Sequence, residues 1–359
     1  VDFDGMSKAV DDFNASHETL KKGLALMPVK FGISFNTPKL NQAGALVHVY
    51  ADGSVHLNHG GTEMGQGLFT KVAQVVASVF QIDLDNIKIS ATRTDKVPNT
   101  SATAASSGSD LNGMAAFNAA NTIKERMTGV AAEIFDTDAD QVEFRQNRVY
   151  AGNESLSFSE LAEQTYNRRV QLSAAGFYST PGLHWDAKSL IGNPFYYFTY
   201  GAAIAEVVID TLTGESRVLR ADMLQDCGNS LNPAIDIGQI EGAFVQGQGW
   251  LTSEELVWND RGQLLTHGPS TYKIPGSRDV PPVFNVHILE DAPNRFPTVF
   301  RSKAVGEPPL MLAISVWLAI RDAVSRTADH RHFVKLDAPA TPEVILNAIE
   351  DVSRRDSVQ

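Results

Sequence analysis

Strands that return through tight turns constrain this chain more than any other feature of its sequence. Alternating apolar segments meet at short polar turns, and Asp-Gly and related pairs adopt the backbone twist that a hairpin needs. The predicted hairpins are Ala45–Tyr50 with Ser54–Asn58, Gln141–Arg145 with Arg148–Ala151, Ala202–Asp210 with Ser216–Met223, and Glu255–Asn259 with Gln263–Thr266. The pattern therefore predicts an α+β fold with antiparallel or mixed sheets and packed helices, and it excludes a doubly wound sheet.

Helical patterns lie between the hairpins. In Leu68–Phe80, apolar residues recur three and four positions apart, which is the period of an amphipathic helix. Further helices are predicted over Met114–Glu133, over Leu310–Thr327, which should be buried, and from the capping sequence Thr341-Pro342-Glu343 onward. A shift in composition near Tyr166–Pro194 predicts two lobes, residues 1–170 and 171–359.

Charge and cysteine content exclude several classes of protein. The 30 basic and 42 acidic residues give a net charge of −12, which disfavours binding to a phosphate backbone. The longest segment without a charged residue, Ser189–Ala205, contains Pro194 and is too polar to span a membrane. Because Cys227 is the single cysteine, this chain cannot itself hold an iron–sulfur cluster. Val1 is not followed by a basic-then-apolar signal segment, so we expect a cytoplasmic protein.

A glycine-rich turn, Gly60-Gly61-Thr62-Glu63-Met64-Gly65-Gln66-Gly67, precedes the Leu68–Phe80 helix. Glycines let backbone N–H groups approach a ligand, and the start of a helix favours anionic atoms. The turn is not a dinucleotide fingerprint, because Thr70 occupies the position of the third glycine. From spacing alone, the turn either binds a ligand or is a tight connection between a strand and a helix.

A hydroxyl-rich segment, Thr100 to Asp110, leads into the second predicted helix. Its small residues permit close approach of the backbone, and its hydroxyl groups can bind a polar ligand. The same composition is also typical of a flexible linker or a helix cap.

Glu307 precedes Pro308-Pro309, which open the Leu310–Thr327 helix. Proline disfavours helical backbone at the preceding residue, so we expect Glu307 to be extended. An ionised carboxylate is favoured at the N-terminus of a helix, and a general base must be ionised when its substrate arrives. The alternative is a carboxylate held there by the helix dipole alone.

Other candidates are weaker. His56 and His59 are three positions apart on a strand and should point to opposite faces, which disfavours a metal pair. No Gly-x-Ser-x-Gly motif is present, and Cys227 has no motif that would make it a nucleophile, so we expect it to be a small buried residue.

Taken together, these segments resemble the molybdenum-binding region of the molybdenum hydroxylases, the family that includes xanthine dehydrogenases and aldehyde oxidases. The similarity extends over nearly the whole chain, in this order: Phe31–Phe35, Leu40–Gly44, the glycine-rich turn, Val97–Ala105, Ser230–Gln239, Gly268–Pro275 and the Glu307 segment. It leans toward the xanthine dehydrogenases, and it implies that this chain is the C-terminal part of the molybdenum region.

The resemblance also implies roles for individual residues. In the family, a pterin dithiolene and terminal oxo, hydroxo and sulfido groups hold the molybdenum, and no side chain binds it directly. Gln66 would hydrogen-bond the oxo group as an outer-shell residue. The other cofactor contacts would be Gly65, Gly67, Thr103, Ala104, Ala105, Ser106 and Gln239. Phe35 and Asn36 would contact a planar substrate, and Glu307 would be the catalytic base.

Two departures from the family pattern stand out. Asn36 follows Phe35 where the family has threonine. The family's second aromatic wall, a substrate-binding arginine, a further glutamate and a phenylalanine-glycine-rich cofactor contact are absent from this chain. The resemblance therefore implies partners: the N-terminal half of the molybdenum region, and iron–sulfur and FAD domains or subunits, in a complete enzyme that is a dimer.

The implied activity is hydroxylation of purines, from hypoxanthine to xanthine to urate. Hydroxylation of aldehydes or of other N-heterocycles is the alternative within enzymes. A non-catalytic molybdopterin-binding or assembly module is the alternative outside them. Glu307 favours an enzyme, because a scaffold needs no carboxylate beside the metal. A nucleic-acid or membrane partner is not expected.

Overall fold

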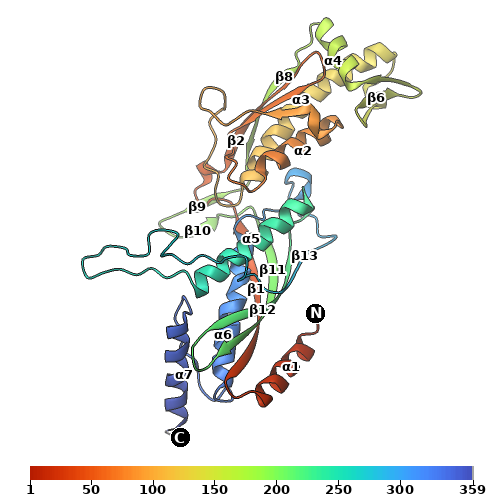
Figure 1. Ribbon diagram of the computed structural model, residues 1–359. Coiled ribbons are helices and arrows are strands. Elements are labelled where there is room, and N and C mark those ends of the chain that lie inside the picture. Colours follow the sequence, from red (N-terminus) through yellow and green to blue (C-terminus); the bar gives the residue numbers. More distant parts are fainter. Residues whose placement is uncertain (358–359) are drawn as a thin grey trace.

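The computed structural model describes residues 1–357, which form two lobes joined end to end (Figure 1). Lobe A contains β2 (Gln42–Val49), β3 (Val55–His59), α2 (Leu68–Phe80), β4 (Ile87–Ile89), α3 (Gly108–Phe135), β5 (Val142–Arg145), β6 (Arg148–Ala151), β7 (Glu154–Ser157), α4 (Phe158–Asn167) and β8 (Ser173–Ser179). Its main sheet has the order β4-β3-β2-β8, and β5, β6 and β7 form a separate small sheet. α2 and α3 pack on the main sheet around one apolar core.

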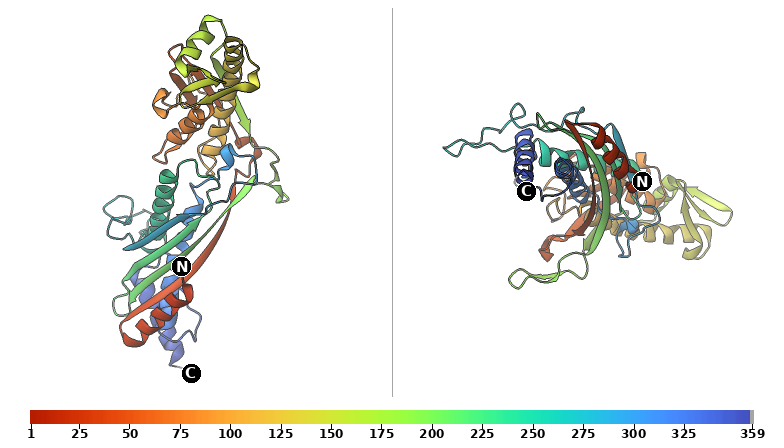
Figure 2. Two further views of the ribbon diagram at one scale, coloured as in Figure 1. Left: turned by 90° about the vertical axis from the view of Figure 1, so that its right-hand side faces the viewer. Right: turned by 90° about the horizontal axis from the view of Figure 1, so that it is seen from below.

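Lobe B is built on a second four-stranded sheet with the order β1-β11-β12-β13. It contains α1 (Phe3–Ser16), β1 (Leu20–Ile33), β11 (Tyr197–Asp210), β12 (Ser216–Gln225), α5 (Pro233–Thr252), β13 (Val283–Ile288), η4 (Val299–Arg301), η5 (Pro308–Ala313), α6 (Ile314–Arg326) and α7 (Pro342–Asp356). Two short strands, β9 (His184–Asp186) and β10 (Ile191–Asn193), connect the lobes. α5, η5 and α6 cover one face of the sheet, as both views in Figure 2 show.

The sheets divide the chain differently from a linear boundary at residue 170. β1 pairs with β11 along its whole length, from Leu20 opposite Asp210 to Ile33 opposite Tyr197, so the N-terminal strand belongs to lobe B. β8, which lies beyond residue 170, pairs with β2 and belongs to lobe A. The physical reason is that each strand completes an apolar core with partners far away in the chain.

Most of the predicted elements are present. α2 has the predicted bounds, α3 and α7 form where predicted, and three of the four hairpins pair as expected. The fourth, around Arg261-Gly262, reduces to a single bridge between Trp258 and Leu264. The predicted Leu310–Thr327 helix begins as the 3₁₀ helix η5 and continues as α6.

The segment Pro308–Arg326 is apolar and long enough to cross a membrane by length and composition. In the structure it packs against β1, β11 and α5, and its residues Leu312, Val316 and Ile320 are fully buried in the core of lobe B. Its apolar character is therefore that of a core helix.

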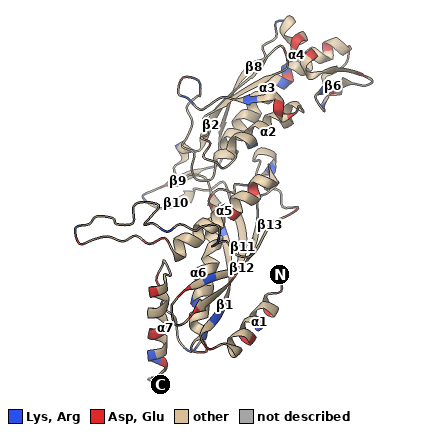
Figure 3. Cartoon of the chain, in the orientation of Figure 1, with Lys and Arg blue, Asp and Glu red and all other residues tan. Residues whose placement is uncertain are grey.

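Acidic and basic residues are interspersed along α7 and on the helices of lobe A (Figure 3).

Candidate functional site

A cavity of about 320 Å³ lies where the two lobes meet, and we call it the inter-lobe cavity. Four segments that are distant in sequence line it: Met64–Lys71 and Thr103–Ser109 from lobe A, and Leu231–Gln239 and Ser302–Glu307 from lobe B. Of the residues predicted from the sequence, Gln66, Thr103, Ala104, Ser106, Gln239 and Glu307 line this cavity. The fold therefore brings together all of the segments that sequence analysis singled out for cofactor binding.

The glycine-rich turn shapes the lobe A wall of the cavity. Gly65 and Gly67 adopt left-handed backbone conformations, with φ of 95° and 76°, which favour glycine. The Glu63 carboxylate accepts hydrogen bonds from the N–H groups of Gly65, Gly67 and Phe69 at 2.9–3.0 Å. Burial would raise the pKa of Glu63, but these donors outweigh it and hold the pKa below its usual value. Glu63 thus occupies the helix start that the sequence had suggested for an external anion.

Gln66 lies between the two glycines and lines the cavity. Its side-chain Oε1 accepts a hydrogen bond from the Met64 N–H at 2.5 Å, and its Nε2 donates to the Thr62 carbonyl at 2.8 Å. Because an amide nitrogen carries two hydrogens, Nε2 keeps a second donor for a ligand. The two internal bonds fix the orientation of the amide within the turn.

The hydroxyl-rich segment forms a polar cradle at the start of α3. Ala105 and Ser106 have left-handed backbone with φ of 53° and 55°. Among the described residues, their N–H groups have no hydrogen-bond partner, and neither do those of Gly108 and Ser109 in the first turn of α3. These donors and the nearby hydroxyls suit a polar, anionic group such as a phosphorylated pterin. The donor set therefore fits the cofactor that the family resemblance implies.

Two buried charges line the same cavity and were not singled out from the sequence. The Lys71 ammonium on α2 pairs with the Asp236 carboxylate on α5, and Ser230 donates a hydrogen bond to the same carboxylate at 2.5 Å. Gln239 lies one turn after Asp236 on α5 and also faces the cavity. One signal in the sequence could have found this pair: Lys71 lies within the apolar stripe of the Leu68–Phe80 helix. Because a buried charge is rarely unpaired, a lysine at this position predicts an acidic partner.

Glu307 is exposed and lies at the N-terminus of η5. Its backbone is helical, with φ −91° and ψ −38°, so the extended conformation expected from Pro308 is wrong. The disfavoured conformation is held by a hydrogen bond from the Glu307 N–H to the Ser106 hydroxyl at 2.7 Å, and by η5, whose Leu310 N–H donates to the Glu307 carbonyl. The Glu307 carboxylate has no hydrogen-bond partner within residues 1–357, which leaves it available to a ligand.

A second cavity of about 450 Å³ adjoins the first, and we call it the aromatic cavity. It is lined by Lys30, Phe31, Gly32, Ser34, Phe35, Asn36, Ala105, Phe195 and Glu307. The Phe35 backbone is held by the Asn41 side chain, which accepts from the Phe35 N–H at 2.8 Å and donates to its carbonyl at 2.9 Å. Glu307 lines both cavities, so it stands between the predicted cofactor contacts and the predicted substrate contacts.

The weaker candidates have structural explanations. Within the described chain, no group of three or more His, Cys, Asp or Glu residues could hold a metal ion. His59 is buried, and burial lowers its pKa to about 4. Burial raises the pKa of the Cys227 thiol to about 12, which keeps it from acting as a nucleophile.

The sequence matches the family model described as "Molybdopterin cofactor-binding domain" over residues 1–281. Because the match covers most of the chain, the protein belongs to this family. Among curated proteins, the chain is 51% identical over 354 residues to xanthine dehydrogenase of Oryza sativa subsp. japonica, and 49% identical over 348 residues to xanthine dehydrogenase/oxidase of Mus musculus. These matches cover 95–96% of this chain and 24–25% of the relatives, so the chain spans about a quarter of their length.

Solved structures share the fold. Quinoline 2-oxidoreductase from Pseudomonas putida 86 matches with a TM-score of 0.83 and 23% identity, over 97% of this chain and 44% of that chain. The Cu,Mo-CO dehydrogenase matches with a TM-score of 0.82 and 21% identity, again over 97% and 44%. Both confirm the predicted α+β architecture of the molybdenum hydroxylase type.

Proposed function

We propose that this chain forms part of a molybdenum–pterin-dependent hydroxylase in which Glu307 is the catalytic base. The observation that carries the proposal is the position of Glu307 between the inter-lobe cavity and the aromatic cavity. A base at this place contacts a group bound in the first cavity and a substrate bound in the second. A non-catalytic cofactor-binding module would not need a free carboxylate there.

The inter-lobe cavity would hold the molybdenum–pterin group, which supplies a two-electron oxidant when bound. The N–H groups of Ser106, Gly108 and Ser109 would hold its anionic part, together with the hydroxyl of Ser106. Ala105, which lines the aromatic cavity, would contact the side of the group that faces the substrate. Gln66 would donate its second Nε2 hydrogen to a terminal oxygen. Thr103, Ala104 and Gln239 would complete the contacts. Gly65 and Gly67, whose N–H groups donate to Glu63, would act by giving the turn its shape. In this proposal no side chain of the chain binds the metal directly.

The aromatic cavity would hold the substrate. Phe35 offers a flat apolar surface for a planar ring, and Asn36 offers an amide for its polar edge. The Glu307 carboxylate would accept the proton of the attacking oxygen as the carbon–oxygen bond forms at the electron-poor ring carbon. The carbon–hydrogen bond at that atom would break, and its two electrons would go to the oxidant in the inter-lobe cavity. The identity with xanthine dehydrogenases supports a purine as the substrate, with hypoxanthine and xanthine as the successive substrates.

The rest of the enzyme would supply the electron acceptors. One cysteine cannot hold a cluster, so iron–sulfur and FAD groups would be in other domains or subunits. The other half of the molybdenum region would close the two cavities. We propose a complete enzyme that is a dimer and works in the cytoplasm.

The test is Glu307→Gln in the complete enzyme, which keeps the size of the side chain and removes its basicity. The rate of enzyme reduction by xanthine should fall about 10²–10⁴-fold with molybdenum and pterin content unchanged. Glu343→Gln is the matched control, because Glu343 is also an exposed carboxylate beside a proline in the first turn of a helix, α7. Retention of more than about a tenth of the rate would refute the catalytic role, and faster turnover of aldehydes than of purines would refute the purine assignment.

A further inference from the structure

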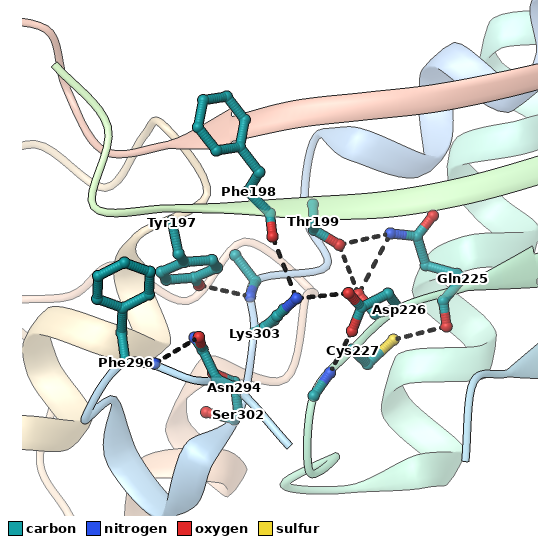
Figure 4. Close-up of polar contacts among 12 residues, drawn as sticks. Tyr197, Phe198, Thr199, Gln225, Asp226, Cys227, Asn294, Phe296, Ser302 and Lys303 are labelled. Carbon is teal, nitrogen blue, oxygen red and sulfur yellow. Dashed lines mark hydrogen bonds and ion pairs between the residues drawn. The ribbon is translucent and has the colours of Figure 1, made fainter. Parts of the chain in front are cut away.

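The segment Ser302–Glu307, which we call the glutamate segment, is held to lobe B by its lysine (Figure 4). The Lys303 N–H donates to the Cys227 carbonyl at 2.8 Å. Its ammonium donates to the Asp226 carboxylate at 2.5 Å and to the Phe198 carbonyl at 3.1 Å. The Lys303–Asp226 pair is largely buried, so this end of the segment has a fixed position relative to the sheet of lobe B.

Tyr197 links the glutamate segment to lobe A. Its phenolic oxygen accepts a hydrogen bond from the Ala304 N–H at 2.8 Å, and its O–H donates to the Asp110 Oδ2 at 2.7 Å. Asp110 lies in the first turn of α3, whereas Tyr197 is the first residue of β11. All three residues are buried, so water cannot easily replace any of these bonds.

The direction of the two bonds depends on Asp110. Burial raises the pKa of Asp110 to about 7, so above that pH its carboxylate is ionised and only accepts hydrogen bonds, which directs the hydrogen of the Tyr197 hydroxyl toward α3. The lone pairs of the hydroxyl then face the Ala304 N–H. Hydrogen bonds in such a chain polarise and strengthen one another in a buried environment.

A second link joins the same two elements. Three residues after Ala304, the Glu307 N–H donates to the Ser106 hydroxyl, and Ser106 is four residues before Asp110. The start of α3 therefore holds the glutamate segment at two points, once directly and once through Tyr197. We propose that Tyr197 is a positioning residue that, with Asp110, sets the place of the Glu307 carboxylate between the two cavities. This inference depends on the proposed role of Glu307 as the base.

Tyr197→Phe in the complete enzyme removes the hydroxyl and keeps the ring. It should lower kcat by about 10–100-fold with KM changed less than threefold, because a displacement of about 1 Å at a reacting group can cost about 10²-fold. Tyr196→Phe is the matched control: Tyr196 is the neighbouring buried tyrosine, and among the described residues no hydrogen bond joins its hydroxyl to Asp110 or to the glutamate segment. Its kcat should stay within about twofold of wild type.

A double-mutant cycle separates positioning from general destabilisation. If Tyr197 acts through Glu307, Tyr197→Phe should have almost no further effect on the residual rate of Glu307→Gln. Hydrogen exchange measured by mass spectrometry at pH 8 should also be faster in Tyr197→Phe for the peptide containing Ala304. If Tyr197→Phe does not yield folded enzyme, Asp110→Ala tests the same chain of hydrogen bonds from its other end.

The outcomes are distinguishable. Equal effects of Tyr197→Phe in the wild-type and Glu307→Gln backgrounds would overturn the positioning role, as would unchanged exchange at Ala304. An active Glu307→Gln enzyme would instead refute the proposed function, whatever Tyr197→Phe does. A large loss in Glu307→Gln, together with a Tyr197→Phe effect that disappears in that background, is the result we expect.

Discussion

Gln66 makes two hydrogen bonds within the glycine-rich turn and lines the inter-lobe cavity. Both polar atoms of its amide bond to the glycine-rich turn, and one N–H remains for the cavity. Removal of one preorganised donor beside a reacting centre costs about 10–1000-fold in turnover. We therefore expect Gln66→Ala to lower the turnover of the complete enzyme within that range and to alter its molybdenum spectra. Gln164→Ala, on α4, is the control, because its amide bonds Arg168 far from the cavity. Unchanged turnover and spectra in Gln66→Ala would contradict its role.

His59 should make the free energy of unfolding depend on pH. Burial lowers its pKa to about 4, whereas in the unfolded chain it is 6.5. Between these values the unfolded chain binds an extra proton, so stability is lost as the pH falls from 6.5 toward 4. We expect His59 to contribute up to about 3 kcal/mol of this loss. Urea unfolding at pH 7 and pH 4.5 should show a smaller loss in His59→Asn than in wild type, and an equal loss would contradict the assignment.

Some features of single residues could be predicted from the sequence, and others could not. The glycine-rich turn around Gln66 and the prolines after Glu307 stand out in the sequence, but the roles of these two residues were predicted from the family resemblance. The conformation of Glu307 could not be predicted, because the Ser106 hydroxyl that holds it comes from 201 residues away in the sequence. The pairing of Lys71 with Asp236 could not be predicted either, because 165 residues separate them in the sequence.

At the scale of elements, the Lys71–Asp236 pair ties α2 of lobe A to α5 of lobe B. Asp236→Ala leaves a buried, uncompensated ammonium, which typically costs about 3–5 kcal/mol. The double variant Lys71→Met, Asp236→Ala should recover most of that loss, because no unpaired charge then remains buried. Urea unfolding of the single and double variants measures the difference, and a double variant as unstable as Asp236→Ala would contradict this view of the pair.

Elements with a regular apolar period or a tight turn were predicted well, whereas α4 and α5 were missed although each begins with a capping sequence. α2 has a regular apolar period, and the hairpin between β2 and β3 has Asp52-Gly53 at its turn. α5 was not predicted, because glycines and glutamines interrupt its apolar residues, although Asn232-Pro233 is the same capping pattern as Thr341-Pro342. Residues 255–266 carry a good turn sequence, yet no neighbouring strand completes a sheet with them.

At the scale of the whole molecule, this chain leaves one face of the lobe B sheet uncovered. The uncovered face of the lobe B sheet exposes Leu26, Tyr200 and Leu224, which are 52%, 48% and 42% accessible. Exposed apolar surface of this kind promotes association. We expect the chain expressed alone to self-associate, to retain cofactor poorly and to lack purine oxidation with an artificial acceptor.

Analytical ultracentrifugation of the isolated chain would measure the association, and Leu26→Glu with Leu224→Lys should reduce it. A monomeric chain that holds molybdopterin and oxidises xanthine would refute the expectation. The two lobes were expected from a shift in composition near Tyr166–Pro194, but the membership of β1 and β8 could not be predicted, because strand pairing between distant segments leaves no local mark in a sequence.

During synthesis on the ribosome, β1 is translated well before β11, the strand with which it pairs. All of lobe A is translated between Ile33 and Tyr197, the nearest partners of that ladder. At about 5–20 residues per second, translation of this interval lasts roughly 10–30 s. During that time lobe A can form its own core, while β1 emerges without its neighbour. A message that ends before Tyr197 would therefore release β1 without its partner strand, with its apolar side chains accessible to chaperones and proteases.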